Sequence, residues 1–466
     1  MAARFQNIDR DTPLLLPPDL RDWVPDDDLS HFVIDAVAAL SLDNIKVNRR
    51  GTGDAQYPPA MMLSLLIYCY ATGLFSSRRI ERATWQNVSV RFICGDTHPD
   101  HDTLCTFRRQ NGPLLAECFL KTLELARELK LLKLGTVAID GTKILAHASK
   151  HAANSYQKAG ELITTLETEV AELIAKAEDA DSTPLEDGLT IPMEIARRAE
   201  RIAKLALARQ VIEARAREKA AAEKAERTAA LTERAARLAR GEKLKGQAPA
   251  SPESVSEAPA PTDQYNYTDP GSRIMKTGRG FEQCYNAQAA VEIESRLIVG
   301  QHVTAAPNDK EQLNPTLESI PATVGRPEAV LNDSGFYSAA AVAEAEAPNA
   351  DGTPRTTVYS AVKRTGHHRR IADLEKRDDP PPPGPGATAR ERMVHRTATK
   401  AGREKYQQRQ QTVEPVFGII KAAMGFRQFL LRGLAKVNLE WNLVSLAYNF
   451  RRLHVLSMGA KLPALA

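Results

Sequence analysis

The chain has 466 residues, of which 43% are hydrophobic and 26% are charged. This length allows about two to four domains with a sizeable core. No apolar run reaches the roughly 18–20 residues that a membrane helix needs, and the first residues carry no secretory pattern. The five cysteines are odd in number and form no CxxC pair, which argues against a disulfide framework and against a cysteine zinc site. We therefore expect a cytoplasmic protein without a membrane partner.

The net charge of +4 is unevenly distributed along the chain. Residues 355–455 contain 20 lysines and arginines against 8 aspartates and glutamates, a local charge of +12. A basic region in a nearly balanced protein indicates a polyanionic partner, most often a nucleic acid. A solvated basic face is the alternative.

The first 130 residues are expected to form a helical domain. Capping residues, prolines and apolar periodicity predict four short helices there. Short helices with arginines on one face are similar to helix-turn-helix DNA-binding domains, although other small helical domains share this pattern. The four expected helices lie at residues 29–40, 60–72, 78–83 and around 107–109.

The pattern changes at residue 134. An apolar strand is expected to run through Ile139, followed by a turn at Asp140-Gly141 and a second strand. Residues 154–241 are rich in Ala, Glu, Lys, Arg and Leu and read as two helical runs, broken near residues 182–184 and 191–192. They predict a helical hairpin or coiled-coil insertion, followed by a proline-rich linker at residues 248–261.

Strand patterns resume after the linker, with a hairpin at residues 286–303, a helix, and two further strands before a mostly helical tail. An antiparallel group leading into alternating helix and strand fits an RNase H-like α/β core. The expected domains are a helical N-terminal DNA-binding domain (1–130), the first part of the core (131–153), the helical insertion with its linker (154–261), and the rest of the core with the C-terminal helices (262–456).

Three acidic residues are candidates for catalysis. Asp140 and Asp333 each follow an apolar strand, a position where α/β sheets often carry functional groups, but each could instead belong to a simple turn. Glu414 shares a broad half of a helix with Tyr406, Arg409 and Lys421, provided that the helix is continuous. Pro415 disfavours a regular helix at this point, so either the helix kinks at Glu414 or one segment ends there and another begins.

The combination of these motifs is more specific than any one of them. Asp140-Gly-Thr, Asp333-Ser-Gly-Phe-Tyr and the run Tyr406-(2)-Arg409-(4)-Glu414-(6)-Lys421 resemble the DDE transposases of bacterial insertion sequences, in the branch with a Tyr-Arg-Glu-Lys signature. The resemblance covers residues 5–455 except the insertion. Many relatives have three residues between the arginine and the glutamate, whereas this chain has four.

The resemblance implies a DNA-cutting and DNA-joining enzyme. Asp140, Asp333 and Glu414 would be catalytic and would bind two Mg²⁺ ions, which Mn²⁺ can replace; hard oxygen ligands suit both the ion and phosphodiester chemistry. The partners would be double-stranded DNA, both the terminal inverted repeats and the target, bound by a homodimer associated with the nucleoid. The expected DNA contacts are Tyr406, Arg409, Lys421, Arg78, Arg79, Arg108 and Arg109.

Three other classes of protein compete with this interpretation. A non-catalytic DNA-binding relative would have lost one or more of the acids, but all three are present. A general RNase H-like nuclease would not require the Tyr-Arg-Glu-Lys helix or the N-terminal helical domain. A structural coiled-coil protein would explain only the insertion.

Overall fold

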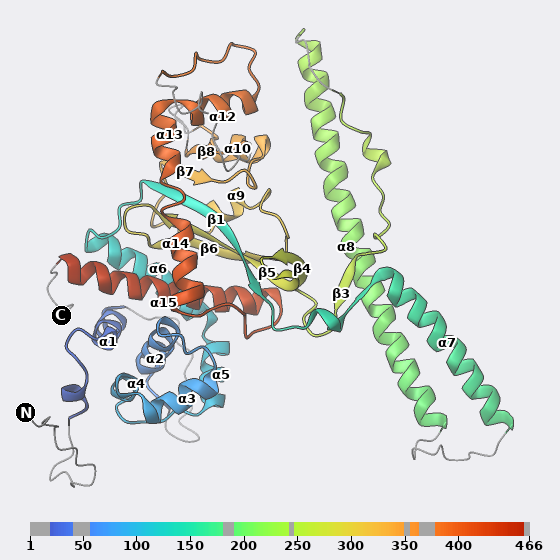
Figure 1. The fold of residues 1–466 in the computed structure, drawn as a ribbon, viewed down its shortest axis with the longest axis horizontal. Coiled ribbons are helices and arrows are strands. Elements are labelled where there is room, and N and C mark those ends of the chain that lie inside the picture. The colour runs from blue at the N-terminus through green and yellow to red at the C-terminus, as the bar shows by residue number, and fades with distance from the viewer. Residues whose placement is uncertain are drawn as a thin grey trace, which may run out of the picture. The chain divides into compact units, whose positions relative to one another are not determined.

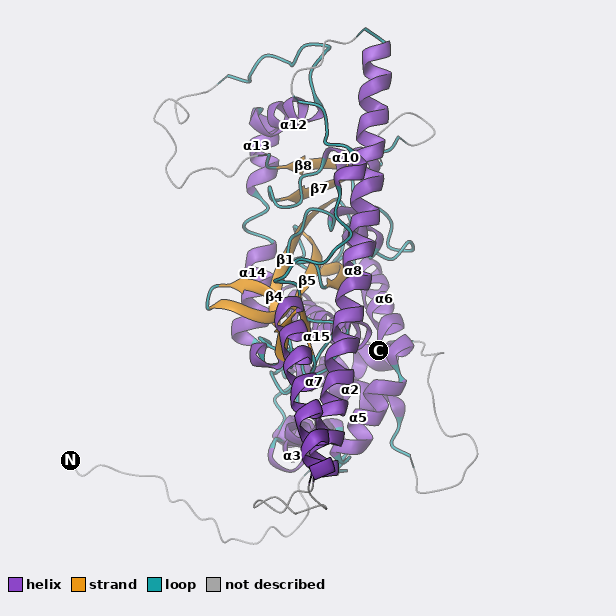
Figure 2. Cartoon of the chain, turned by 90° about the vertical axis from the view of Figure 1, so that its right-hand side faces the viewer, coloured by secondary structure: helices purple, strands orange, loops and turns teal. Residues whose placement is uncertain are grey.

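The computed structural model describes residues 19–40, 56–179, 191–241, 247–348, 355–362 and 378–460. The chain divides into two compact units, one formed by residues 1–144 and 286–466 and the other by residues 145–285. Figure 1 follows the chain through both units, and Figure 2 distinguishes its helices from its strands and loops. Among the described residues, none of the helices is both long and apolar enough to cross a membrane.

The N-terminal part of the first unit is helical, as the sequence predicts. Asp28 caps α1 (Leu29–Ala39) by accepting a hydrogen bond from the Ser30 amide at 2.8 Å. Helix α2 (Pro59–Ala71) begins at a proline, whose missing amide hydrogen has no role in a first turn. The remaining helices of this part are α3 (Ser77–Gln86), α4 (Val88–Ile93), α5 (His101–Gln110) and α6 (Gly112–Glu128).

The same unit contains a mixed sheet with the strand order β6-β5-β1-β7-β8. The first three strands in sequence run antiparallel: β5 pairs antiparallel with β6, and hydrogen bonds near both ends of β1 join it antiparallel to β5. Strand β7 then pairs parallel to β1, and β8 pairs parallel to β7. The strands are β1 (Thr136–Leu145), β5 (Gly280–Glu292), β6 (Ile298–Thr304), β7 (Ala329–Asn332) and β8 (Thr357–Ser360).

The expected turn at Asp140-Gly141 is wrong, because β1 continues without a break to Leu145. Glycine is needed there for lack of space rather than for a turn. A Cβ atom on Gly141 would lie 2.4 Å from Nε2 of Gln288 and 2.5 Å from Oδ1 of Asp309. The alternative interpretation of Asp140 as a hairpin-turn residue is thereby removed.

The parallel strands are joined by short helices. Helix α9 (Leu313–Glu318) lies between β6 and β7 in the chain and is shorter than the helix expected at residues 310–319. Helix α10 (Ala339–Ala345), which the sequence did not predict, lies between β7 and β8. These connections leave the carboxyl end of β7 beside the middle of β1, because Leu331 pairs with Ala138.

The long C-terminal helix α15 (Leu434–Ala460) covers the edge of the sheet. It contacts β6 as well as α2 and α6. Asn449 pairs with both backbone groups of Ile298 at 2.8 and 2.9 Å, and Asn438 does the same for Val303 at 2.7 and 3.2 Å. Side-chain amides on α15 thus satisfy backbone groups on the outer edge of β6.

The rest of the tail is divided into short helices rather than one continuous helix. It consists of α12 (Ala389–Ala398), α13 (Lys400–Gln407), α14 (Val413–Gly418) and a π-helical turn, η4 (Ile419–Ala423). The break falls at residues 408–412, before Glu414, so neither expected position of the break is correct. Pro415 lies in the first turn of α14, where its missing amide hydrogen is tolerated.

The second unit contains two long helices, α7 (Tyr156–Asp179) and α8 (Ile191–Ala239), as expected for the insertion. They pack along a small apolar core that includes Leu166 and Leu205. The expected break at residues 182–184 lies outside the described residues. The proline-rich linker is held along α8, because Arg227 donates to Ser254 and Lys224 pairs with Glu257.

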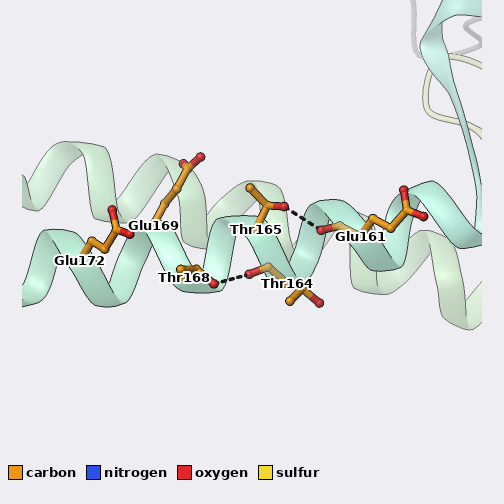
Figure 3. Close-up of a pocket in the computed structure, with 6 residues that line it drawn as sticks. All are labelled: Glu161, Thr164, Thr165, Thr168, Glu169 and Glu172. Carbon is orange, nitrogen blue, oxygen red and sulfur yellow. Dashed lines mark hydrogen bonds between the residues drawn. The ribbon is translucent and has the colours of Figure 1, made fainter.

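Three short strands complete the second unit. Strand β2 (Ala153–Ser155) pairs with β3 (Gln264–Asn266), and β4 (Arg273–Thr277) forms a hairpin with the first part of β5. The exposed side of α7 is polar (Figure 3), and hydroxyls there donate back to helix carbonyls, as Thr165 does to Glu161 and Thr168 to Thr164. This side of α7 therefore has the character of an ordinary solvated helix face.

Candidate active site

Asp140 lies in the middle of β1, with its side chain 19% exposed. Burial and, next in size, the charge of Asp333 raise the pKa of this carboxyl to about 7. The Arg409 guanidinium and the Gly141 amide, which donates to Asp140 Oδ1 at 2.8 Å, act in the opposite direction. An acid that is crowded by a second acid requires a nearby cation in order to ionise fully at neutral pH.

Asp333 directly follows β7, on the strand next to β1. Its Oδ1 accepts a hydrogen bond from the Gly335 amide at 2.8 Å, which fixes the turn that leaves the strand. The two interpretations of this residue, as a turn residue and as a strand-end functional group, are therefore compatible. Its charge acts on both Asp140 and Tyr406, which places it within the same cluster.

Arg409 lies between two acids, although it precedes α14 in the chain. Its Nη1 is 3.3 Å from Oδ2 of Asp140, and its Nη2 is 3.7 Å from Oε1 of Glu414. Only 11% of its side chain is exposed, whereas the side chain of Glu414 is 56% exposed. Arg409 itself lies in the turn at residues 408–412, which separates α13 from α14.

Tyr406 and Lys421 complete the cluster from either side of α14. Burial raises the pKa of Tyr406, its hydrogen bond with Arg409 lowers it, and the charges of Asp333 and Asp140 raise it. Lys421 lies in the π-helical turn and donates to the Thr142 hydroxyl and to the Lys143 carbonyl. All six candidate residues from the core and the C-terminal segment thus gather around β1 and the end of β7.

A fourth acid, Asp309, lies near this cluster and was not singled out from the sequence. Its Oδ1 accepts hydrogen bonds from Asn286 and Gln288, both at 2.6 Å, and lies 3.8 Å from Nζ of Lys143. The charge of Asp309 contributes to the raised pKa of Asp140. A polar strand residue followed two positions later by another, Asn286 and Gln288, is the sequence signal that could have indicated a buried polar network here.

The N-terminal arginines fall into two groups. Arg78, Arg79 and Arg109 are exposed. Arg108 is buried and donates to the Tyr70 hydroxyl at 2.6 Å. Its side chain therefore supports the interior of the helical part, and a DNA contact is not compatible with this conformation.

The chemistry of the carboxylates suits a hard cation such as Mg²⁺, since all three offer oxygen ligands and the charge of Asp333 acts on Asp140. Among the described residues, no three His, Cys, Asp or Glu side chains are gathered closely enough to hold a metal ion. The guanidinium of Arg409 lies between Asp140 and Glu414. The three carboxylates therefore suit magnesium by their chemistry, and the arginine lies between two of them.

A surface hollow lies elsewhere, on α7. It is lined by Glu161, Thr164, Thr165, Thr168, Glu169 and Glu172, all from one helix (Figure 3). Its hydroxyls are used in hydrogen bonds along the helix. It contains none of the candidate residues and offers no converging set of catalytic groups.

Two sequence families match this chain. The family described as "Transposase DDE domain" matches residues 386–454, the segment that holds Tyr406, Arg409, Glu414 and Lys421. The family described as "Transposase domain (DUF772)" matches residues 18–110, which form the N-terminal helices. No curated protein and no solved structure matches the chain significantly. The two family matches support a DDE transposase of an insertion sequence.

Proposed function

We propose that this transposase cuts DNA at the ends of its element and joins the freed ends to target DNA, using Asp140, Asp333 and Glu414 as its catalytic acids. The observation that carries this proposal is the approach of Asp140 and Glu414 to one guanidinium, with Asp333 close enough for its charge to act on Asp140, whose pKa is raised to about 7. Residues with strongly perturbed pKa values next to a specific charged partner are candidates for function.

The three acids would hold two Mg²⁺ ions, for which Mn²⁺ can substitute. When bound, the ions would activate the attacking oxygen and stabilise the leaving oxygen of an in-line displacement. The remaining task of the chain is to bind and orient DNA. Water would first attack at the transposon end, and the resulting 3′-hydroxyl would then attack a second phosphodiester.

The DNA contacts that we propose follow from charge and hydrogen-bonding chemistry and, for the N-terminal arginines, also from exposure. Tyr406, Arg409 and Lys421 would bind phosphates next to the scissile bond, because cations and hydroxyls are the usual phosphate ligands. Arg78, Arg79 and Arg109 would contribute to recognition of the terminal inverted repeats from α3 and α5, where their side chains are exposed. Arg108 is left out of this set because it is buried.

We further propose that the sheet is an RNase H-like core and that the chain belongs to the Tyr-Arg-Glu-Lys branch. Three antiparallel strands followed by two parallel strands support the first assignment. The closeness of Arg409 to Glu414 at 3.7 Å supports the second. We also propose that the protein acts as a homodimer that brings two transposon ends together, in the bacterial cytoplasm at the nucleoid.

The test is strand cleavage of a duplex that carries the terminal inverted repeat, in the presence of Mg²⁺. We expect Asp140→Asn, Asp333→Asn and Glu414→Gln each to lower the cleavage rate by about a thousandfold or more while end binding is retained, since each removes one ligand of the catalytic ions. Asp35→Asn and Glu404→Gln, which remove exposed acids from α1 and α13, are the matched controls.

The outcomes separate the proposed residues from one another. A candidate whose variant cleaves as well as the controls would be excluded from the catalytic set. Wild-type protein that binds the duplex but never cuts it would favour a DNA-binding protein without catalysis.

A further inference from the structure

Arg409 is enclosed by groups that belong to the catalytic cluster. Acids approach it from β1 (Asp140) and α14 (Glu414), and the Tyr406 hydroxyl from α13 forms a hydrogen bond with it. Asp333, at the end of β7, contributes its charge to both Asp140 and Tyr406. Arg409 is therefore the cation that these acids surround in this conformation.

The contacts of Arg409 are weak for a buried guanidinium. Its distances of 3.3 and 3.7 Å to the two carboxylates exceed the 2.6 Å that separates Arg108 from the Tyr70 hydroxyl. Within the described part of the chain, its buried Nε has no hydrogen-bond partner. A buried donor without a partner is unfavourable, so the guanidinium would gain by moving to a ligand that uses all of its donors, such as a phosphate.

We propose that Arg409 occupies the cation position between Asp140 and Glu414 while DNA is absent, so that metal ions and DNA bind this site cooperatively. The inference rests on the proposed function, because it takes the two acids as metal ligands. A phosphate that draws the guanidinium away leaves both acids free for cations. By linkage, DNA then strengthens metal binding and metal strengthens DNA binding by the same factor.

This coupling has a consequence for the DNA-free protein. The guanidinium and a metal ion compete for the same carboxylates, so removing the guanidinium should tighten metal binding. If Arg409 instead arranged the carboxylates for metal binding, its removal would weaken binding. The two roles therefore predict changes of opposite sign.

The experiment measures Mn²⁺ affinity of the full-length, DNA-free protein by calorimetry or by the paramagnetic resonance of free Mn²⁺. We expect Arg409→Gln to bind Mn²⁺ about tenfold more tightly than wild type, within the range of typical coupling energies. Arg403→Gln removes a positive charge from α13 without touching the acids and should change the affinity by less than about twofold. Arg409→Lys, which keeps the charge but cannot bridge two carboxylates, serves as the second variant if the first does not fold.

The measurement is repeated with a saturating, pre-cleaved transposon-end duplex. Wild type and Arg409→Gln should then bind Mn²⁺ with similar affinities, because the guanidinium has left the acids in the wild type. Unchanged or weaker binding by the DNA-free Arg409 variants would overturn the inference.

A double variant separates this failure from a failure of the proposed function. Adding Asp140→Asn to Arg409→Gln should abolish the tight Mn²⁺ binding. If that binding survives, the metal lies elsewhere, and both the inference and the proposed metal site are lost. If it is abolished but Arg409 variants do not tighten binding, only the inference is lost.

Discussion

Two acids of this protein, the partly buried Asp140 on β1 and the fully buried Glu440 on α15, share a pKa raised to about 7, chiefly by loss of solvent. Their surroundings differ. Glu440 accepts hydrogen bonds from the Leu430 and Leu431 amides at 3.0 and 2.9 Å, and the charge of Arg108 favours its ionised form. Asp140 instead faces a second acid, Asp333, which opposes ionisation.

The comparison teaches that a raised pKa does not by itself indicate function. Glu440 is surrounded by donors that belong to the fold, so its oxygens have lasting partners. Asp140 is surrounded by other acids and by one loosely held arginine, so its negative charge is only partly compensated. The sign of the neighbouring charges, rather than the size of the shift, distinguishes the catalytic candidate from the structural acid.

Removal of Arg108 should have the largest effect on stability. Arg108→Ala deletes the hydrogen bond to Tyr70 and leaves Glu440 without its cation, so we expect the free energy of unfolding to fall by about 3 kcal/mol. Arg109→Ala, at the exposed neighbouring position, should change it by less than about 0.5 kcal/mol. Denaturant unfolding followed by tryptophan fluorescence measures both. Equal losses in the two variants would contradict the structural role of Arg108.

The pH dependence of stability should reveal Asp140. Its folded-state pKa of about 7 lies above the roughly 3.9 of an unfolded aspartate. Between these values the folded protein holds a proton that the unfolded chain has released, so this acid lowers stability as pH rises from about 4 to 7. Asp140→Asn removes that loss.

In metal-free buffer we expect Asp140→Asn to be more stable than wild type by about 2 kcal/mol at pH 8, which is less than the full shift of about 4 kcal/mol because the side chain retains some exposure. The two proteins should have equal stability near pH 4. Unfolding in the presence of a chelator at both pH values provides the measurement. A variant that loses stability relative to wild type as pH rises would contradict the predicted direction of this pH dependence.

The smallest effect is expected at Glu440. Glutamine keeps an oxygen that accepts from the Leu430 and Leu431 amides, so Glu440→Gln should alter the free energy of unfolding by no more than about 1 kcal/mol. End cleavage should stay within about twofold of wild type, because α15 carries none of the proposed ligands. A large loss of cleavage here would remove the distinction between the two acids.

Much of the fold could be predicted because local signals agree with the tertiary structure. Asp28 and Pro59 mark helix starts by capping chemistry that acts within a few residues. The helices of the insertion could be predicted from the amino-acid composition of that segment. The turn predicted at Asp140-Gly141 is wrong, because Asp-Gly is common in hairpin turns, whereas here the side chains of Gln288 and Asp309 fill the space beside the glycine.

The candidate site was predictable in its residues but not in its contacts. The motif spacing singled out Asp140, Asp333 and Glu414, yet no local pattern indicates that Arg409 lies between two of them. Asp309 was missed because its partners lie more than twenty residues earlier in the chain, on β5. Arg108 was assigned to DNA because an arginine pair on a short helix gives no sign of which member is buried.

The non-helical segment at residues 408–412 has a consequence for how the chain can vary in length. In a continuous helix, one added residue rotates every later side chain by about 100°, which would turn Glu414 away from Asp140. A turn absorbs an added residue locally. The longer spacing between Arg409 and Glu414 is therefore a difference in loop length. It leaves the position of the Glu414 carboxylate unchanged. Insertions should be tolerated in this turn, whereas one within α14 or η4 would separate Glu414 from Lys421.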